Sequence, residues 1–489
     1  MLLGQLLKPW APHDFQKKAV KFLLQNQAAA LFLDPGLGKT SITLAALKIL
    51  IKKKLTSKIL VIAPLRVCHS VWPAEIKKWK DFKDLKCVVL HGPKKDELLK
   101  QEADIYIINP EGLDWLIKPA KAKTPKGKVK ISVDVRKFKA LGFDTLVVDE
   151  LSKFKHHGSQ RFKMMKEVLK TFARRWGLTG SPASNGLMGL FGQCYMLDTG
   201  RTFGKYITQY RSKYFDKGHD GFSWKLKEGA DTEIYKALKP LALRMSADDY
   251  LEMPKLIQNN IMVELPPKAR AIYDRLEADM IVEFDGNTVT AVNAAVLSGK
   301  CRQVASGGIY LNNEIMSIIK GVQLEKEWAN VHNAKTEALV DLVDELQGSP
   351  LLVAYDYKHD LDRIQKAFGG DIPYIGSGVS VKKSKIIEDD WNAGKIPLLL
   401  GHPQSIGHGL NLQESGQHVA FYSMIWDYET YDQFIRRVLR QGNKHKRVFL
   451  HHIMAEDTID QDILNVLIGK RLGQNALFDA IKSLVKRRK

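Results

Sequence analysis

Cysteine is scarce in this 489-residue sequence, and the four cysteines lie far apart, at positions 68, 87, 194 and 301. No two of them form a C-x-x-C pair, so the sequence encodes neither a disulfide framework nor a local zinc site. This usage is typical of a reducing compartment, and we expect the protein to be cytoplasmic.

Long apolar runs are also missing. No uninterrupted stretch approaches the roughly 18–20 apolar residues that a membrane-spanning helix needs. The first ten residues, MLLGQLLKPW, lack a basic stretch followed by an apolar core and a cleavage site. No repeat of fixed period is present. We therefore expect a soluble protein that is not exported and does not bind membranes.

Acidic residues are outnumbered by basic ones. Subtracting 54 aspartates and glutamates from 75 lysines and arginines leaves a formal net charge of +21. Such an excess favours a polyanionic partner, most simply nucleic acid, although a merely soluble basic protein has the same composition. The segment 118–139 has nine basic side chains against one acidic, Asp134, and residues 486–489 are all basic. Each run is expected either to form solvated loops or tails or to contact phosphate groups.

The sequence does contain two series of strand-length apolar runs that alternate with helical patterns. The first series comprises 29–33, 59–65, 104–109, 145–150 and 176–180, and the second comprises 351–357, 396–402, 418–423 and 448–454. This alternation is typical of parallel sheets with crossover helices. We predict an α/β fold with two parallel-sheet lobes at 1–240 and 333–489, joined by a mostly helical connector at 241–332.

The strongest chemical signal is DPGLGKT, residues 34–40, between an apolar run and a helix-like segment. Glycines let the backbone curl so that N–H groups and the helix N-terminus face phosphate oxygens, while the lysine reaches the terminal phosphates. The pattern G-x-x-x-x-G-K-[ST] fails only at its first position, Leu33; a glycine turn that caps a helix is the structural alternative. The candidate ATP ligands here are Gly36, Leu37, Gly38, Lys39, Thr40 and Ser41.

A second signal is LVVDE, which ends in Asp149 and Glu150. Carboxylates at the end of a buried strand suit a magnesium ligand and a general base that positions the attacking water. We assign Thr40 and Asp149 to Mg²⁺ and Glu150 to the base. Two acids at a strand end are common, so this assignment depends on the phosphate loop.

A third signal is YDQFIRRVLRQG near the C-terminus. On one continuous helix, Gln433, Arg437 and Arg440 would share a face, so that both guanidinium groups could project together. Arginines on a second lobe can neutralise charge on a transferred phosphoryl group. A solvated basic helix is the alternative, and Arg436 lies on a different face.

Nine segments in order resemble the motifs of helicase superfamily two, the DEAD/DEAH-like enzymes, and within it the Swi/Snf-type translocases of double-stranded DNA. They are HDFQKKA with Gln16, DPGLGKT, VIAPLRVCHSVWPAEIKKW, IINPEGL, VVDELSKFK, GLTGSPASN, LLVAYDYKHD, HPQSIGHGLNLQESG and YDQFIRRVLRQGN. Compact members from bacteriophage and prophage replication regions are similar in ADDYLEMP and GHGLNLQ. The resemblance covers about residues 15–459. The acidic motif of this sequence reads DELS, whereas the same motif ends in histidine in many relatives.

The resemblance implies two RecA-like lobes, ATP and Mg²⁺ as cofactors, and an ATP hydrolase that acts as a translocase or helicase on duplex or branched DNA in phage replication or recombination. It implies adenine contact by Gln16 and closure of the ATP cleft by Gln433, Arg437 and Arg440. The segments that would touch DNA, or couple it to ATP, contain Pro64, Arg66, Asn109, Thr179, Ser405, Gly407 and Asn411.

Other assignments are plainer. We expect Trp72, Trp79 and Trp426 to pack in the core, and we assign no metal to the histidine pairs 156/157 and 451/452. A monomer in the cytoplasm, that of the host if phage-encoded, is expected, with replication proteins or nucleases as protein partners. Three alternatives stay open: an RNA-directed helicase, an ATP-gated recruitment module with little motor activity, and the motor subunit of a defence complex.

Overall fold

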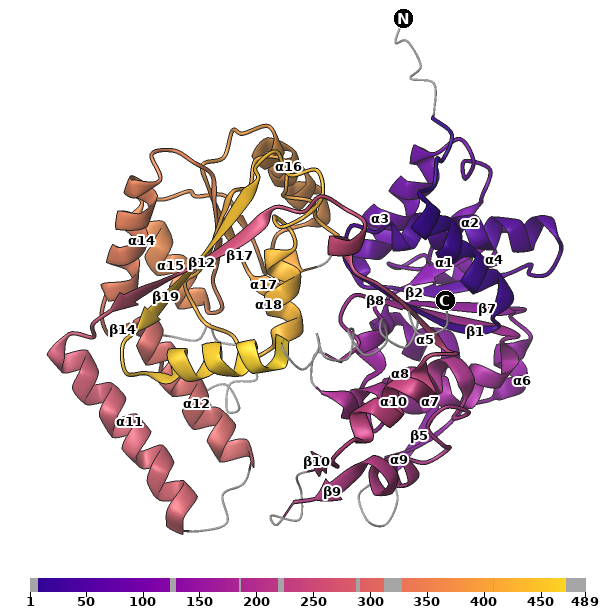
Figure 1. Cartoon of the computed structure of the whole chain (residues 1–489), viewed down its shortest axis with the longest axis horizontal. Helices are drawn as coiled ribbons and strands as arrows, with labels where there is room; N and C mark the ends of the chain where they lie inside the picture. The colour runs from indigo at the N-terminus through magenta and orange to yellow at the C-terminus, as the bar shows by residue number, and fades with distance from the viewer. Residues whose placement is uncertain are drawn as a thin grey trace, which may run out of the picture. The chain divides into compact units, whose positions relative to one another are not determined.

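A computed structural model describes residues 8–123, 129–183, 186–218, 224–286, 291–311, 328–407 and 409–471. Two compact units divide this chain: lobe 1 extends to Glu252, and lobe 2 comprises Met253–Gly469. Each lobe is built on one parallel sheet (Figure 1). The predicted α/β fold with two parallel-sheet lobes is confirmed, and all nine predicted runs form strands.

Lobe 1 contains a seven-stranded sheet in which every pair of neighbours is parallel. Its strands in spatial order are β11 (Ala242–Met245), β1 (Ala28–Leu33), β8 (Arg174–Thr179), β7 (Thr145–Asp149), β2 (Ile59–Ile62), β4 (Ile105–Ile108) and β3 (Cys87–Val89). The helices of lobe 1 are α1 (Asp14–Gln25), α2 (Lys39–Lys52), α3 (Leu65–Lys78), α4 (Lys95–Lys100), α5 (Leu113–Ile117), α6 (Val135–Lys139), α7 (Gln160–Val168), α8 (Leu190–Asp198), α9 (Ile207–Tyr214) and α10 (Ala230–Leu238).

Both faces of this sheet are covered by helices. Alternate residues of one strand join different core clusters: Ile59 and Val61 pack with α1, α2 and α3, whereas Leu60 and Ile62 pack with α5, α7 and α8. Figure 1 shows the two helical layers on opposite sides of the strands. Because successive side chains of a strand point to opposite faces, a strand covered on both faces must be apolar throughout. This requirement explains the uninterrupted runs in the sequence.

Lobe 2 contains a six-stranded parallel sheet. Its strands in spatial order are β12 (Lys255–Val263), β19 (Arg447–Ala455), β18 (His418–Phe421), β15 (Leu351–Ala354), β17 (Leu398–Gly401) and β16 (Tyr374–Ile375). In the described part of lobe 2, the helices are α11 (Pro267–Gly286), α12 (Ala291–Ser306), α14 (Ala334–Glu345), α15 (Lys358–Ala367), α16 (Val381–Asn392), α17 (Pro403–Ile406) and α18 (Tyr428–Ile435), and residues 459–471 are also helical.

The expected helical connector at 241–332 is wrong for its first part. Residues of β11 complete the sheet of lobe 1, and β12 pairs along its whole length with β19 in lobe 2. The edge strand β12 reads KLIQNNIMV and is partly exposed, so it lacks the apolar signature of a central strand. Helices α11 and α12 follow, as expected for the rest of the segment.

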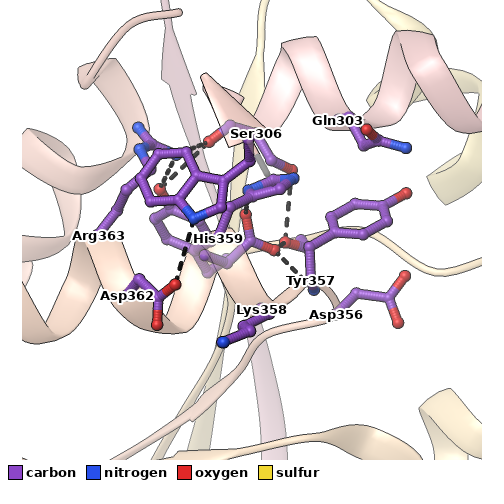
Figure 2. A network of polar contacts seen from close by, with 12 residues as sticks. Gln303, Ser306, Asp356, Tyr357, Lys358, His359, Asp362 and Arg363 are labelled. Atoms are coloured by element: carbon purple, nitrogen blue, oxygen red, sulfur yellow. Dashed lines mark hydrogen bonds and ion pairs between the residues drawn. The ribbon is translucent and has the colours of Figure 1, made fainter. Parts of the chain in front are cut away.

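The end of this segment is fixed to lobe 2 by a buried polar network (Figure 2). Arg363, on α15, donates to the carbonyl oxygen of Ser306 at 2.5 Å and to Asn330 Oδ1 at 2.9 Å. His359 and Asp360 lie beside it, both fully buried. These contacts join α12 and the hairpin of β13 (Gly308–Tyr310) and β14 (Trp328–Asn330) to the sheet, so this part of the segment belongs to lobe 2.

The basic segment 118–139 includes an antiparallel ribbon. Its strands are β5 (Ala120–Lys123) and β6 (Val129–Ser132), and residues 124–128 and 486–489 lie outside the described part of the chain. A second ribbon pairs β9 (Phe215–Lys217) with β10 (Trp224–Leu226). Among the described residues, no helix is both long enough and apolar enough to cross a membrane.

The histidines of lobe 2 form buried contacts across β12, β19 and β18. His451 Nε2 lies 3.1 Å from His418 Nδ1, and His452 Nε2 lies 2.7 Å from the Tyr431 hydroxyl. His452 Nδ1 also lies 3.0 Å from Asn260 Oδ1, which is an acceptor, so the neutral ring donates there and accepts from Tyr431. Burial lowers the pKa values of His418 and His452, and of His332 on the chain before α14, to about 4.

We therefore predict that acid destabilises lobe 2 below about pH 6.5. As the pH falls from that value to about 4, the unfolded chain takes up protons on these three histidines while the folded chain does not, so the free energy of unfolding decreases. Each such histidine contributes roughly 1.4 kcal/mol per pH unit in this window. Urea unfolding across this range measures the slope.

The variant His452→Gln keeps a hydrogen-bonding side chain but removes one titrating group, so its slope becomes shallower. The exposed His156, changed to Gln, is the matched control and leaves the slope unchanged. A slope for His452→Gln equal to that of the unchanged protein would contradict this account.

Candidate nucleotide site

The predicted phosphate loop joins β1 to α2. Gly36 and Gly38 have φ values of +95° and +79°, and helix α2 begins at Lys39. The left-handed backbone favours glycine at position 38, and a Cβ atom there, 2.6 Å from Gln16 Nε2, would displace the Gln16 side chain. The first-turn N–H groups of α2 have no partner within the helix and carry partial positive charge. This arrangement is a cradle for phosphate oxygens.

The side chain of Lys39 reaches the end of β1, where its Nζ atom donates to the carbonyl oxygens of Leu33 at 2.8 Å and Asp34 at 3.4 Å. Its charge also reaches Asp149 and opposes the rise in the pKa of that carboxyl group. The ammonium therefore lies between the loop backbone and the acidic pair. This position suits a cation that contacts the terminal phosphates of a nucleotide.

Asp149 is the last residue of β7. Burial raises its pKa to about 6, the charge of Glu150 adds to this effect, and a 2.8 Å hydrogen bond from Trp72 Nε1 opposes it. A divalent cation would stabilise the ionised carboxylate in this position. The hydroxyl of Thr40 and this carboxylate are hard oxygen donors of the kind that Mg²⁺ prefers, so the two predicted ligands fit that ion.

In the part of the chain that the structure describes, no group of three or more His, Cys, Asp or Glu side chains could hold a metal ion. A magnesium ion at Thr40 and Asp149 would therefore complete its shell with water and phosphate oxygens, as is usual for nucleotide sites.

Glu150 follows β7 in the left-handed region, with φ of +72°. Its backbone N–H donates to the carbonyl oxygen of Leu178 at 2.9 Å. Its Oε1 atom accepts hydrogen bonds from Ser152 Oγ at 2.8 Å and from Thr179 Oγ1 at 2.9 Å. An uncommon backbone conformation and two side-chain donors thus fix the direction of this carboxylate, as the orientation of an attacking water requires.

Thr179, which was predicted to lie in a segment that touches DNA or couples it to ATP, lies beside the candidate base. Thr179 ends β8, is fully buried, and donates to Glu150. Strand β8 lies between β1 and β7, which explains why the third motif meets both others at this edge. Gly180, the next residue, faces Pro35 of the phosphate loop, 3.2 Å from the position of a Cβ atom. Thr179 thus orients the candidate base, and its contact with DNA stays a prediction.

Two other predicted ATP ligands have protein partners. Gln16 Nε2 donates to the carbonyl oxygen of Leu37 at 3.2 Å, and its Oε1 atom accepts from the backbone N–H of His13. Ser41 Oγ donates to Glu75 at 2.6 Å. Gln16 thus supports the loop directly, and its adenine contact stays a prediction. The hydroxyl of Ser41 is committed to α3, which leaves its backbone N–H for the nucleotide.

The remaining predicted DNA residues of lobe 1 follow strands β2 and β4. Pro64 and Arg66 begin α3, directly after β2. Asn109 follows β4, where its Nδ2 atom donates to Glu111 at 2.8 Å. All three lie at the carboxyl edge of the sheet, the edge at which ligands bind in open parallel sheets. Their contact with DNA stays a prediction.

The predicted arginine segment of lobe 2 is not one continuous helix, which is a correction. Helix α18 ends at Ile435, and the following residues form turns. The buried side chain of Arg437 folds back. Its Nε atom donates to the carbonyl oxygen of Gln433 and its Nη1 atom to that of Leu410, each at 3.0 Å. Arg440 donates to the side chain of Asn411. Hydrogen bonds from a charged guanidinium group to backbone carbonyl oxygens are strong, and here they stabilise the turn in place of a further helical turn.

These residues nevertheless lie together with the other predicted residues of lobe 2. Gly407 ends α17, and a Cβ atom there would lie 3.1 Å from Gln433 Oε1. Ser405 is in the same short helix. The backbone N–H of Asn411 donates to Glu388 at 2.8 Å. The loop after β17 and the end of α18 thus form one cluster.

The tryptophan expectations are confirmed, with one addition. Trp72 is fully buried and Trp79 and Trp426 pack against the cores of lobes 1 and 2. The Trp72 hydrogen bond to Asp149 was not predicted, because the spacing of tryptophan along α3 does not reveal which carboxylate the indole meets.

A glycine-rich phosphate loop, an acidic pair and a threonine-oriented carboxylate, all at one edge of a parallel sheet, define a P-loop nucleoside triphosphatase. Comparison with known families is consistent with that class. The SNF2-related domain model matches residues 15–323, and the helicase conserved C-terminal domain model matches residues 334–442.

A protein designated p41 of Acyrthosiphon pisum secondary endosymbiont phage 1 is 34% identical over 97% of this chain and 100% of its own length. The ATP-dependent helicase MG018 of Mycoplasma genitalium is 23% identical over 92% of this chain and 41% of its own length. This chain belongs to the SNF2-related ATPase family and is an ATP hydrolase. The SWI2/SNF2 ATPase core of Sulfolobus solfataricus, solved with dsDNA, is 19% identical, with a TM-score of 0.43, over 98% of this chain and 95% of that one.

The position of Thr179 generates a prediction. Thr179→Val removes the hydroxyl that donates to Glu150 without changing the shape of the side chain. A hydrogen bond to a charged group contributes about 1.5–3 kcal/mol, so we expect kcat for ATP hydrolysis to fall by roughly one to two orders of magnitude, with KM for ATP nearly unchanged.

Thr171→Val is the matched control, because the Thr171 hydroxyl donates to the carbonyl oxygen of Val168, away from the acidic pair. Steady-state ATPase assays compare the two variants. Equal kcat values for the two valine variants would show that Thr179 does not orient the base.

Proposed function

We propose that this SNF2-related ATPase is a translocase that moves along duplex or branched DNA, and that it acts in phage DNA replication or recombination. The main support is the ordered hydrolytic site of lobe 1 within a chain whose family match continues through lobe 2. A net charge of +21 favours a polyanionic track. The full-length similarity to a phage protein favours the phage setting.

In the proposed reaction, the loop N–H groups and Lys39 bind the phosphates. Thr40 and Asp149 would hold Mg²⁺, which would supply positive charge that screens the phosphate oxygens. Glu150, oriented by Thr179 and Ser152, accepts the proton of the attacking water. Lobe 1 thus supplies the phosphate-binding groups, the magnesium ligands and the base.

Coupling to DNA is assigned to lobe 2. Arg437 and Arg440 would neutralise the charge that develops on the phosphoryl group when the lobes close around ATP, and Gln433 would take part in that closure. Hydrolysis and release would reopen the lobes, and alternating grip on the DNA backbone would move the protein. Affinity is then largely independent of base sequence and sensitive to salt, because phosphate is the repeating feature of the track. The basic ribbon of β5 and β6 is a candidate contact to that track.

The decisive experiment is ATP turnover measured with duplex, forked, single-stranded and RNA substrates, together with displacement of a triplex strand. Stimulation by duplex or forked DNA with triplex displacement supports a DNA translocase. Preferential stimulation by RNA would replace it with an RNA-directed helicase, and ATP-dependent binding without displacement would replace it with a recruitment module.

The role of Glu150 predicts a separation of binding from chemistry. Glu150→Gln keeps the side-chain shape but cannot accept the proton, so ATP binding stays near normal and hydrolysis is abolished. Lys39→Ala removes the phosphate contact, so it weakens nucleotide binding or turnover. Fluorescent-nucleotide binding and ATPase assays measure both effects. Hydrolysis by Glu150→Gln at the unmutated rate would remove the base assignment.

The arginine assignment predicts a loss of turnover in Arg437→Ala. Arginine fingers contribute about a thousandfold or more in kcat, so DNA-stimulated hydrolysis should fall on that scale. Arg436→Ala is the matched control, because Arg436 pairs with Asp432 on α18 at 2.7 Å and lies on a different side of the segment. Thermal unfolding checks that both variants fold. Undiminished turnover in folded Arg437→Ala protein would contradict the assignment.

A further inference from the structure

The chain leaves lobe 1 through a segment that contacts the phosphate loop. This exit segment comprises β11 and residues 246–252, and lobe 2 begins at Met253. Strand β11 pairs with β1, so the exit segment lies beside the strand that leads into the loop. Neither the composition nor the spacing of these residues predicted such a contact.

The first contact is an ion pair between Arg244 and Asp34. Arg244 Nη2 lies 2.7 Å from Asp34 Oδ1, and the two side chains are only 3% and 6% exposed. Arg244 Nη1 also donates to the carbonyl oxygens of Phe32 at 2.9 Å and Met245 at 2.6 Å. One guanidinium group thus holds the end of β1, the start of the phosphate loop and its own strand together.

The other oxygen of Asp34 is bound by the next residues of the exit segment. Asp34 Oδ2 accepts from Ser246 Oγ at 3.2 Å and from the backbone N–H of Ala247 at 3.0 Å. A buried carboxylate is stable only when its charge and both oxygens are satisfied. Within the exit segment, Arg244 supplies a cation to this carboxylate, and Ser246 and Ala247 supply two neutral donors.

A second contact lies on the other side of the loop. The ring centroid of Tyr250 lies 4.8 Å from that of Phe15, on α1. The neighbour of Phe15 is Gln16, which donates to Leu37 in the phosphate loop. The exit segment therefore meets the loop directly at Asp34 and indirectly through α1.

Lys39 links these contacts to the nucleotide. It donates to the carbonyl oxygens of Leu33 and Asp34, which directly follow the carbonyl of Phe32 that Arg244 binds. A phosphate that draws the Lys39 ammonium toward itself changes the backbone environment at the point where the exit segment is attached. Any shift there is transmitted through a short chain of buried bonds.

We propose that Arg244 is a positioning residue for nucleotide binding, and that the Asp34–Arg244–Ser246 contacts transmit the state of the phosphate loop to the segment that leads into lobe 2. This proposal rests on ATP binding by lobe 1 and not on DNA translocation. Its test therefore uses the full chain without DNA, so failure of the translocase proposal leaves the test intact.

The test is hydrogen exchange of residues 244–252 with and without a non-hydrolysable ATP analogue. In the unchanged protein, we expect the analogue to slow exchange in this segment. In Arg244→Gln, we expect the exchange rates to become independent of the analogue and the Kd for the analogue to rise about tenfold, as loss of a hydrogen-bonded charge implies. A fluorescent ATP analogue measures the Kd.

Arg175→Gln is the matched control. Arg175, on β8, also donates to backbone carbonyls in lobe 1, those of Leu197, Leu169 and Phe172, but none of these belongs to the nucleotide site. This variant should lower the unfolding temperature and leave both the exchange response and the Kd unchanged. A purely structural role of Arg244 would make the two variants behave alike.

Arg244→Gln leaves Asp34 as a buried charge and could prevent folding, so Ser246→Ala provides an independent test. It removes one donor to Asp34 and leaves the ion pair in place, and we expect a reduced exchange response in residues 246–251. The proposal is overturned when folded Arg244→Gln, or Ser246→Ala where the former does not fold, responds to the analogue as the unchanged protein does.

Discussion

The pairing of β8 between β1 and β7 is the constraint on which the nucleotide site depends. Because these strands are parallel neighbours, their carboxyl ends meet at one edge, and three segments separated by many residues become adjacent. The phosphate loop follows β1, the acidic pair ends β7, and Thr179 ends β8. Without that order, the Thr179 hydroxyl could not orient Glu150, and Gly180 could not lie against Pro35.

The acidic residues near the phosphate loop differ in how well the protein stabilises their charge. Burial raises the pKa of Asp149 to about 6, although Trp72 and Lys39 both stabilise its charge. Such a carboxylate is poorly compensated by the protein alone, which suits a residue whose partner is an incoming cation. Asp34 is different, because Arg244, Ser246 and Ala247 donate to both oxygens of its carboxylate and so join the phosphate loop to the exit segment. Two acids near one loop thus have different roles because their surroundings differ.

The buried polar groups of lobe 2 also form two distinct systems. The arginine segment is held by backbone carbonyls and by Asn411, whereas the histidines on β18 and β19 remain neutral and bridge strands. Tyr431 connects these two systems, because it lies on α18 and meets His452 on β19. The helix that carries Gln433 is therefore fixed to the sheet by a buried polar contact as well as by apolar packing.

The amino-acid sequence was enough to predict the two sheets, the phosphate loop and the acidic pair, because strands buried on both faces must be apolar and few residues other than glycine adopt positive φ. It did not determine β11 and β12, since short or edge strands need no long apolar run. It also did not predict the hydrogen bond from Thr179 to Glu150 or the end of α18 at Ile435. These features depend on long-range packing, because hydrogen-bond partners such as Glu150 and the carbonyl oxygen of Leu410 come from distant segments. No local pattern encodes which groups meet when strands pair.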